Sequence, residues 1–387
     1  MEKSRKKILL VMPLSTMKWG SSNAGGVDSV CQIISEYLTN NTNPNYHYRI
    51  VAISLLQEPK AFSGVVRLSD NVELIWIPRK KLISNRVSVP SLFYYMYKVR
   101  QQVREYQPNL IHSHLWAAIL GCQRSIPSIV TVHSYKDIGR THVSTANDWL
   151  YVKLLPYIYK YFGHRIVAVG NALKHTLSLD VSQPVLAISN PIDSEYFKNV
   201  RFVTKDNKIK LVTCALLNPK KQVEKIITLI GLLVKSGIDC QLNIIGPTSD
   251  SKYICQLKGQ VEQEQLTNSV SFLGRLDKAQ IINCYQQSDI GVFLSREETF
   301  GLAPLEMLAS GLPVLATCVG VLAEEKGYFS SVGVTFVDAD DNSDLLERAL
   351  ELLADMRAPD TESLQKKFAV SAVVAQYDKI YSELLGS

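Results

Sequence analysis

Residues 289–317 read DIGVFL-SREETFG-LAPLEMLASG-LPVLAT and join a short apolar run to a helical pattern through a polar turn. Residues 290–294 have the composition of a buried strand, and residues 302–310 have the spacing of a helix that a glycine and a proline then close. In open parallel sheets, ligands collect in such strand-to-helix turns. The free amides of Gly301 and Leu302 at the helix start therefore predict an anionic ligand.

Two glutamates flank the start of that helix, with seven residues between them. Side chains on a helix lean toward its N-terminus, so Glu306 is expected to reach back and accept hydrogen bonds from a ribose diol. Glu298, which precedes the helix, is expected to meet a hydroxyl-rich sugar at the other end of the phosphates. The alternatives are that Glu298 caps the helix and that Glu306 is an ordinary solvated carboxylate.

Length and composition indicate a soluble globular protein of two domains. The chain has 387 residues, of which 46% are hydrophobic and 20% charged, and its formal net charge is +6. That excess suits anionic ligands or a lipid surface, but it is far below that of a dedicated nucleic-acid binder, and no nucleic-acid-binding module is organised along the chain. The seven scattered cysteines form no C-x-x-C pair, which indicates a reducing compartment.

The N-terminus, MEKSRKKILLVMPL, has the basic start and apolar run of a signal peptide. The apolar run is short and no small-residue cleavage site follows it closely, so a first β-strand is the favoured interpretation. No apolar run approaches the roughly 18 residues that suggest a membrane span. We therefore expect a cytoplasmic protein.

Apolar β-type runs alternate with helical patterns almost throughout, which is typical of parallel sheets covered on both faces. A polar, proline-containing segment at 190–207 separates two such halves. The sequence therefore predicts a first Rossmann-like domain over 1–195, a second over 196–365, and a C-terminal helix over 366–387 that packs back towards the first. The predicted strands lie near 6–12, 48–56, 72–77, 109–113, 127–132, 165–169, 185–188, 209–215, 240–245, 269–273, 289–294, 313–316 and 333–337, and the predicted helices of the first half near 27–38, 91–105, 115–123, 147–161 and 170–178.

The stretch EETFGLAPLEMLASGLPVLAT resembles the E-x7-E signature of the retaining glycosyltransferases of family 4. Further motifs similar to those of this family follow one another in the family's order. They are NAGGVDSVCQIISEYL (23–38), PNLIHSHLWAAILG (108–121), IVTVHSYKD (129–137), ISNPIDSEYF (188–197, with proline in place of the usual glycine) and VSFLGRLDKAQIINCYQQSDIGVFLS (270–295). The resemblance covers nearly the whole chain.

This resemblance implies the α/β GT-B fold, with two Rossmann-like domains facing each other across a cleft, the first binding the acceptor and the second the nucleotide sugar. It implies a retaining, metal-independent hexosyltransferase that needs no cofactor beyond its nucleoside-diphosphate-sugar co-substrate. The expected acceptor is a glycan or a lipid-linked molecule, as in the synthesis of cell-surface polysaccharide or glycolipid. In this family the leaving diphosphate is thought to take the acceptor's proton, so preorganised donors around it dominate catalysis.

The family's site residues are carried over onto matching positions of this chain. His133 is expected to contact the transferred sugar, Lys221 to neutralise the diphosphate and Glu298 to hold sugar hydroxyls. The other contacts with the donor are expected from the amides of the glycine loop, from the turn and the start of the following helix, and from an acid that binds the ribose. These residues are Gly25 and Gly26, then Phe300, Gly301 and Leu302, and finally Glu306.

One departure from the family pattern lies after the first strand of the second half. The family commonly shows G-R-L-x-P-x-K-G, whereas residues 215–222 read ALLNPKKQ, so Leu216 stands at the arginine position and Gln222 at a glycine position. Arginine grips phosphate oxygens in pairs, and its loss leaves three alternatives: Lys220 compensates, the donor is held more weakly, or the enzyme is impaired. A catalytically impaired nucleotide-sugar-binding subunit, for which Leu216 is the hint, is therefore one alternative function. A GT-B nucleotide-sugar epimerase is another, but it would need catalytic carboxylates and histidines placed differently. A phosphorylase would need a pyridoxal-phosphate lysine.

Two other patterns resemble metal sites. The H-x-H spacing of His112 and His114 could suggest zinc, but no cysteine or carboxylate is nearby in sequence, so a structural or acceptor-side role is favoured. Asp338 and Asp340 resemble the D-x-D of another glycosyltransferase fold, although a helix cap at Asp341 or Ser343 explains the segment better. We predict no metal.

The segment from Arg79 to Arg104 carries seven Lys or Arg residues and no acid. On its helix, Phe93 and Tyr97 line up with Arg100 and Arg104 beside an inward apolar stripe. This pattern suits contact with an anionic membrane surface or a lipid-diphosphate acceptor, and a peripheral location on the inner face of the membrane. The alternative is a solvated face with packed tyrosines.

Overall fold

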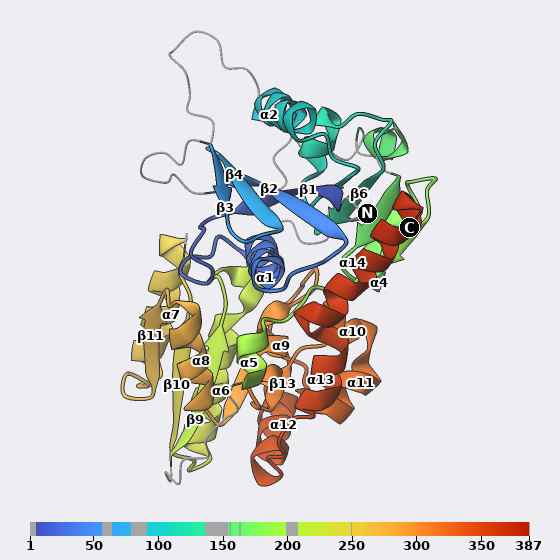
Figure 1. The fold of residues 1–387 in the computed structure, drawn as a ribbon. Helices are drawn as coiled ribbons and strands as arrows, with labels where there is room; N and C mark the ends of the chain where they lie inside the picture. The colour runs from blue at the N-terminus through green and yellow to red at the C-terminus, as the bar shows by residue number, and fades with distance from the viewer. Residues whose placement is uncertain are drawn as a thin grey trace. The chain divides into compact units, whose positions relative to one another are not determined.

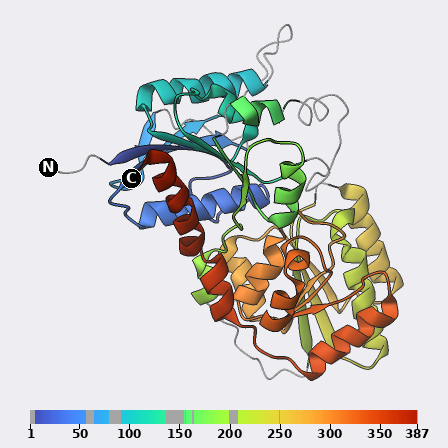
Figure 2. The same cartoon turned by 90° about the vertical axis from the view of Figure 1, so that its right-hand side faces the viewer.

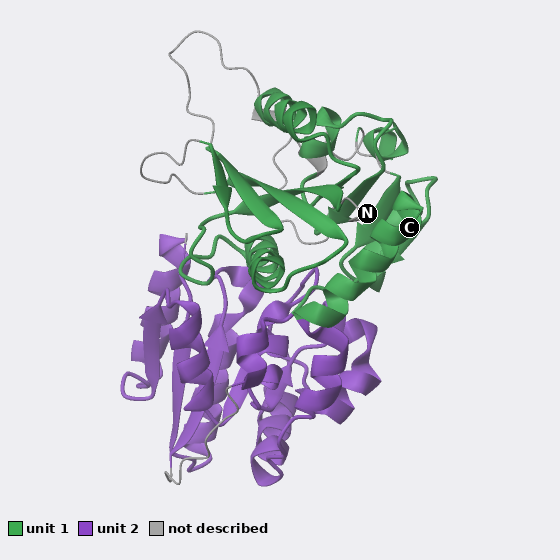
Figure 3. Cartoon of the chain, in the orientation of Figure 1, with its two compact units in different colours: residues 1–191, 370–387 green, residues 192–369 purple. Residues whose placement is uncertain are grey.

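The computed structural model describes residues 5–55, 64–78, 91–135, 154, 156–161, 164–198, 208–248 and 250–386. The chain divides into two compact units (Figures 1 and 3). Unit 1 comprises Met1–Pro191 and Val370–Ser387, and unit 2 comprises Ile192–Ala369. Within the described ranges, no helix has both the length and the apolar character needed to cross a membrane.

Unit 1 is built on an eight-stranded sheet in the order β3-β4-β2-β1-β5-β6-β7-β8. Its strands run parallel except β3, which pairs antiparallel with β4 at one edge. The strands are β1 Lys6–Leu14, β2 Tyr46–Ser54, β3 Val65–Arg67, β4 Val72–Ile77, β5 Leu110–Ser113, β6 Ser128–Val132, β7 Arg165–Ala168 and β8 Val185–Ala187; the helices are α1 Gly26–Asn40, α2 Ser91–Tyr106, the 3-10 helix η1 Trp116–Gly121, α4 Asn171–Ser178 and α14 Val370–Leu385.

Alternate residues of these strands face two different helical layers, because side chains along a strand point to opposite faces. Leu9 and Val11 of β1 belong to a core that includes Val99 and Val103 of α2. Met12, on the other face, accepts a hydrogen bond at its sulfur from Ser35 of α1. Figure 1 shows α2 on one side of the sheet and α1 with α14 on the other.

Unit 2 is built on a six-stranded, fully parallel sheet in the order β11-β10-β9-β12-β13-β14. The strands are β9 Ile209–Cys214, β10 Cys240–Ile245, β11 Val270–Gly274, β12 Ile290–Phe293, β13 Val314–Ala316 and β14 Val334–Phe336. The helices are α5 Ser194–Lys198, the 3-10 helix η2 Pro219–Lys221, α6 Val223–Lys235, α7 Ser251–Gln263, α8 Lys278–Gln286, α9 Leu302–Ala309, α10 Val321–Glu324, α11 Lys326–Val332, α12 Asn342–Ala354 and α13 Thr361–Phe368.

Two separate apolar cores cover the faces of this sheet, and Figure 2 shows the helices that lie on either side of it. Leu211 and Val292 pack with α6, α7 and α12 on one face. Val212 and Phe293 pack with α8, α9, α11 and α13 on the other. The inner strands β12 and β13 are thus buried on both sides, which explains why their sequences are continuous apolar runs rather than alternating ones.

Every strand predicted from the sequence is present, with ends within two residues of the prediction. The short edge strand β3 was not predicted, and the helix expected at 115–123 is the 3-10 helix η1. The helices expected at 27–38, 91–105 and 170–178 correspond to α1, α2 and α4. Part of the helix expected at 147–161 lies outside the described residues, as do residues 79–90 of the basic segment.

The chain passes between the units after Pro191 and after Ala369, and not at the predicted boundaries 195/196 and 365/366. The crossings are tied together inside unit 2, because the backbone N–H of Ile192 donates to the carbonyl oxygen of Phe368 at 2.8 Å. The predicted single helix over 366–387 is interrupted at Ala369, whose backbone is extended, so α13 belongs to unit 2 and α14 to unit 1. In unit 1, α14 lies against α1 and β5.

The loop that follows β1 is held by a buried carboxylate. Asp28, in the first turn of α1, is 1% exposed. Its two oxygens accept hydrogen bonds from the backbone N–H groups of Ser15, at 2.9 Å, and Ala24, at 2.7 Å. Gln32 adds a second tie, since its side chain accepts from the N–H of Gly20 and donates to the carbonyl oxygen of Ser22. The glycine loop therefore depends on α1 for its shape.

We expect Asp28→Ala to lower the free energy of unfolding by roughly 2–4 kcal/mol, because it strands the buried amide of Ser15 and also removes the charged acceptor of the Ala24 amide. Asp70→Ala is the matched control: Asp70 pairs with Arg67 on the surface, and its side chain is 83% exposed. Losing such a pair costs less than about 1 kcal/mol. Urea unfolding of both variants measures the difference, and equal losses would contradict the account of the loop.

Candidate functional site

The topology of unit 2 brings two predicted site residues together. The chain builds β10 and β11 on one side of β9, and then β12, β13 and β14 on the other, so the strand order reverses between β9 and β12. Ligands of open α/β sheets bind at such a switch point, beyond the carboxyl ends of the strands. Here the Nζ of Lys221, after β9, forms an ion pair with the Oε1 of Glu298, after β12.

The two turns are joined by further contacts beside this pair. The backbone N–H of Arg296 donates to the carbonyl oxygen of Lys220 at 2.8 Å, and the Lys220 ammonium forms an ion pair with Glu297. Lys221 and Glu298 are mostly shielded, with side chains 20% and 15% exposed, whereas the Lys220–Glu297 pair is more open to solvent. The inner pair is therefore the better placed for binding chemistry.

Glu298 is fixed by residues that the sequence analysis did not single out. The hydroxyl of Ser295 donates to its Oε1 at 2.9 Å, and the hydroxyl of Thr317 donates to the Ser295 carbonyl oxygen at 2.6 Å. Gly320 (φ 58°) approaches so closely that an added Cβ would lie 2.4 Å from the Phe300 carbonyl oxygen. The alternative interpretation, in which Glu298 caps the next helix, does not hold, because no side chain caps α9.

The start of α9 carries the predicted anion site. Gly301 is its N-cap residue and has the left-handed backbone (φ 91°) that glycine adopts readily. Phe300 is buried in an apolar core and stacks edge-on against Phe368, while Leu302 is half-buried. With no capping side chain, the first amides of α9 remain available to a ligand, and the helix dipole favours a negative one.

Glu306 lies on the second turn of α9 in a partly buried position. Loss of hydration, with the nearby charge of Asp193 adding to it, raises its pKa to about 7. Among the described residues, none donates a hydrogen bond to this carboxylate. Asp193 itself is paired with Lys278 at 2.7 Å. Glu306 is thus an acceptor that lacks a protein partner, and not the solvated carboxylate of the alternative reading.

The departures from the family pattern in the β9 turn have distinct structural consequences. Leu216, at the usual arginine position, is 47% exposed. The ammonium of Lys220, proposed as its substitute, is engaged by Glu297. Gln222 adopts the left-handed conformation (φ 47°, ψ 43°) that glycine would favour, so the backbone turn forms without the glycine.

The glycine loop and the histidines lie in unit 1. Gly25 is the N-cap residue of α1 with φ 136°, and Gly26 begins the helix. The amide of Gly25, expected to face phosphate, donates to the Oδ1 of Asn23 at 2.7 Å. His133 follows β6 and contacts His114, which follows β5.

Burial keeps the histidine cluster of unit 1 uncharged near neutral pH. It lowers the pKa of His112 to about 3 and that of His133 to about 4. Burial and the two neighbouring rings lower the pKa of His114 well below its ordinary value. Both ring nitrogens of His112 are hydrogen-bonded to hydroxyl groups, which favours a structural role for this residue.

The structure shows the surroundings of the sequence patterns that resemble metal sites. In the described part of the chain, no three His, Cys, Asp or Glu side chains gather as a metal site would require. Asp341 caps α12 by accepting from the amides of Ser343 and Asp344, as the sequence predicted. Asp338 contributes to the same turn, because its amide donates to Asp344 at 2.7 Å.

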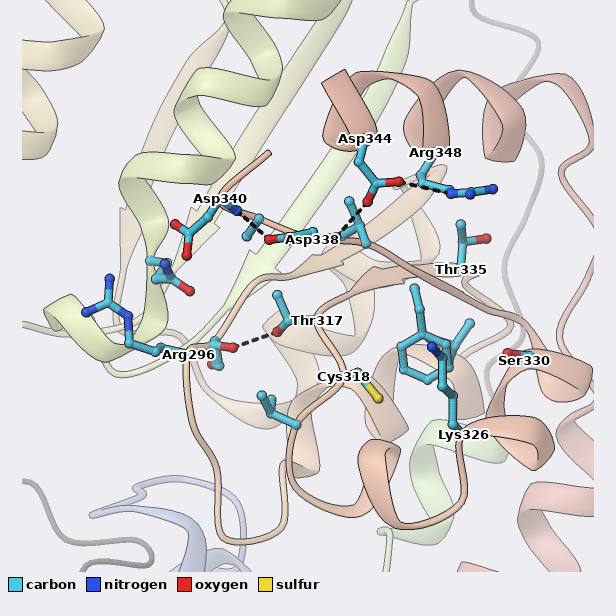
Figure 4. A pocket seen from close by; sticks show the side chains of 17 residues that line it. Arg296, Thr317, Cys318, Lys326, Ser330, Thr335, Asp338, Asp340, Asp344 and Arg348 are labelled. Carbon is cyan, nitrogen blue, oxygen red and sulfur yellow. Dashed lines mark hydrogen bonds and ion pairs between the residues drawn. The ribbon is translucent and has the colours of Figure 1, made fainter. Parts of the chain in front are cut away.

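A cavity of about 760 Å³ opens beyond β12, β13 and β14 (Figure 4). It borders the turn through Ser295 and Arg296 but is lined by neither Glu298 nor Glu306. Its charged walls are largely neutralised by neighbours: Asp344 pairs with Arg348 at 3.2 Å, and Asp340 pairs with a lysine of α6 at 3.1 Å.

Two family models match adjacent parts of the chain. "Glycosyltransferase Family 4" matches residues 25–196, and "Glycosyl transferases group 1" matches residues 195–368. The boundary between the two matches lies close to the first crossing between the units.

Known proteins are similar to the chain in sequence and in fold. The N-acetyl-alpha-D-glucosaminyl L-malate synthase of Bacillus anthracis is 31% identical over 170 residues, which is 43% of this chain and 43% of that relative, so the alignment spans less than half of its length. Among solved structures, sucrose-phosphate synthase from Thermosynechococcus elongatus superposes with a TM-score of 0.77 at 18% identity, covering 99% of this chain and 100% of that one.

An Anabaena protein solved in complex with UDP and glucose superposes with a TM-score of 0.71 at 17% identity, covering 98% of this chain and 100% of that chain. At such identities, the structural likeness establishes the fold. With both family models matched and two Rossmann-like sheets present, the chain belongs to the family 4-type glycosyltransferases, which are enzymes of the GT-B fold.

Proposed function

We propose that the protein transfers a sugar from a nucleoside-diphosphate sugar to a hydroxyl group of a glycan or lipid-linked acceptor, with retention at the anomeric carbon and without a metal ion. The observation that carries this proposal is the Lys221–Glu298 pair at the switch point of unit 2. Beside it lie an uncapped helix start and a carboxylate without a described donor. Together they match the three parts of such a donor: phosphates, sugar and ribose.

Similar proteins support the choice of ligand. The Anabaena structure contains UDP and glucose, and the Bacillus relative is named for transfer of an N-acetylglucosaminyl group. A basic side chain and free amides suffice in chemical terms to neutralise a diphosphate, which is why we propose that no metal is needed.

In the proposed reaction, the bound donor breaks the ion pair between Lys221 and Glu298. The ammonium turns to the diphosphate, and the carboxylate accepts hydrogen bonds from sugar hydroxyls. The bond from the anomeric carbon to the diphosphate oxygen breaks, and a bond from the acceptor oxygen forms on the same face. The acceptor's proton passes to the leaving diphosphate. Negative charge grows on that group, so Lys221 and the α9 amides stabilise the transition state more than the ground state.

A catalytically impaired nucleotide-sugar-binding subunit is the second candidate. It is favoured by one observation, the exposed Leu216 where arginine is usual, with Lys220 already paired. Such a protein would bind the nucleotide sugar but would not transfer or hydrolyse its sugar.

We expect Glu306→Gln to weaken nucleotide-sugar binding roughly 10- to 100-fold, because hydrogen bonds to a charged acceptor are worth about 1.5–3 kcal/mol. Glu298→Gln should mainly lower the rate of transfer and leave the dissociation constant within a few-fold. Calorimetric titration with UDP-, GDP- and ADP-sugars, together with turnover measurements, tests both. If neither variant changes affinity or turnover, the site has been placed wrongly; wild-type binding without turnover selects the impaired subunit.

The affinity should also depend on pH. The pKa of Glu306 is about 7, and only the ionised carboxylate accepts hydrogen bonds from both ribose hydroxyls, so affinity rises as pH rises through 7. We expect binding about tenfold tighter at pH 8 than at pH 6. An intact nucleotide sugar is the right ligand because it lacks the terminal phosphate that titrates near pH 6. Glu306→Gln should abolish the dependence, and an unchanged slope in this variant would assign it to another group.

The membrane interaction expected for the basic segment also remains a proposal, and helix α2 supports it. Its Phe93 and Tyr97 are 50% and 64% exposed, and Arg100 and Arg104 are exposed along the same side. Val99 and Val103 face the core, as the sequence predicted. An exposed face of aromatic and basic residues is suited to anionic headgroups.

We expect wild-type protein to sediment with vesicles that contain phosphatidylglycerol at low salt, and Phe93→Ser/Tyr97→Ser to bind at least several-fold more weakly. Tyr157→Ser is the matched control, since Tyr157 is equally exposed elsewhere in unit 1. Equal binding by the double variant and the control would exclude α2 as the contact surface.

A further inference from the structure

Three histidines of unit 1 lie side by side at the carboxyl ends of β5 and β6. The ring centroids of His112 and His114 are 4.6 Å apart, and those of His114 and His133 are 5.2 Å apart and stacked. The Nδ1 of His114 and the Nε2 of His133 share a hydrogen bond of 2.9 Å. The strand order of unit 1 reverses between β1 and β5, so β5 borders the switch point and the cluster lies beside the expected ligand edge of this sheet.

The C-terminal helix α14 holds the base of this cluster. The hydroxyl of Tyr381 lies 2.7 Å from His112 Nδ1, and the hydroxyl of Thr131 lies 2.8 Å from His112 Nε2. Thr131 in turn contacts the hydroxyl of Tyr377 at 3.1 Å. His112 lies two residues before His114, and Thr131 lies two residues before His133. The hydrogen bonds of His112 and Thr131 therefore fix β5 and β6, the strands that lead to His114 and His133.

The His114–His133 hydrogen bond contains one proton, because burial keeps both rings neutral. Either ring could donate it. If His133 Nε2–H donated, the proton of His114 would sit on its other nitrogen, Nε2. That atom is buried in a side chain that is 4% exposed, and it has no hydrogen-bond partner among the residues described.

The two arrangements differ in what they leave unpaired. A stranded buried N–H costs about 1–3 kcal/mol, and such orphaned donors are rarer in proteins than under-used acceptors. The arrangement with a bare lone pair at His114 Nε2 is therefore favoured. In that arrangement His114 donates from Nδ1, and His133 keeps its own proton on Nδ1.

We propose that His114 is a positioning residue for His133: by donating its Nδ1–H to His133 Nε2, it selects the tautomer in which His133 presents Nδ1–H to the transferred sugar or its phosphate. The inference rests on the proposed function and on the expectation from the family resemblance that His133 contacts the transferred sugar. The tautomer itself is a property of the ligand-free protein and can be measured without a substrate.

The direct test is two-bond ¹⁵N–¹H correlation spectroscopy of the full chain labelled at histidine, at pH 7.5. Ring signals are assigned by comparison with His114→Asn and His133→Asn. The expected spectrum shows His133 protonated at Nδ1 and unprotonated at Nε2, and His114 protonated at Nδ1. A His133 protonated at Nε2 would overturn the proposal and leave the proposed function untouched.

A kinetic test separates positioning from mere packing. His114→Leu fills similar space without a hydrogen bond, and His114→Asn can return a donor to the position of Nδ1. We expect the leucine variant to lower kcat at least about tenfold with little change in KM for the nucleotide sugar, since a misassigned tautomer disables a ring that remains in place. The asparagine variant should recover most of kcat.

His47→Asn is the matched control. His47 is also hydrogen-bonded in unit 1, to the hydroxyl of Tyr106 at 2.8 Å, but it lies outside the site, so turnover should not change. A folded His114→Leu variant with wild-type kcat, or an asparagine variant no better than leucine, would refute the positioning role. If leucine prevents folding, the asparagine variant and the wild-type spectrum still decide.

Discussion

The ion pair between Lys221 and Glu298 is the interaction on which the site depends. It exists because β9 and β12 are neighbours in the sheet, although 75 residues lie between Cys214, the last residue of β9, and Ile290, the first residue of β12. The pair is mostly shielded, and breaking it without replacement would leave two poorly hydrated charges. In the proposed function, a nucleoside-diphosphate sugar replaces both partners at once, with phosphate for the lysine and hydroxyl groups for the glutamate.

The support around this pair follows the same logic in both units. Ser295 and Thr317 hold the glutamate turn in unit 2, and Asp28 holds the glycine loop in unit 1. In each case a side-chain hydrogen bond ties a loop to the elements beside it. Burial then sets the charge state: it lowers the pKa values of His112, His114 and His133 and raises the pKa of Glu306 to about 7.

Much of this could be predicted from the sequence because the decisive signals are local. Strands buried on both faces read as continuous apolar runs, and Glu298, Gly301 and Glu306 occur within one turn and one helix. The edge strand β3 is three residues long and lacks such a signal. The break at Ala369 and the crossing at Ile192 depend on a contact between residues far apart in the chain. The contact of Thr317 with Ser295 and that of His114 with His133 likewise arise only when separate strand ends meet.

The most direct test of the central claim is a crystal structure with an intact nucleotide sugar bound. The account predicts the diphosphate within hydrogen-bond distance of the Leu302 amide and of Lys221 Nζ, with the ribose on Glu306 and the sugar on Glu298, so that the ion pair is divided. A nucleotide bound elsewhere, or bound while Lys221 and Glu298 remain paired, would contradict it.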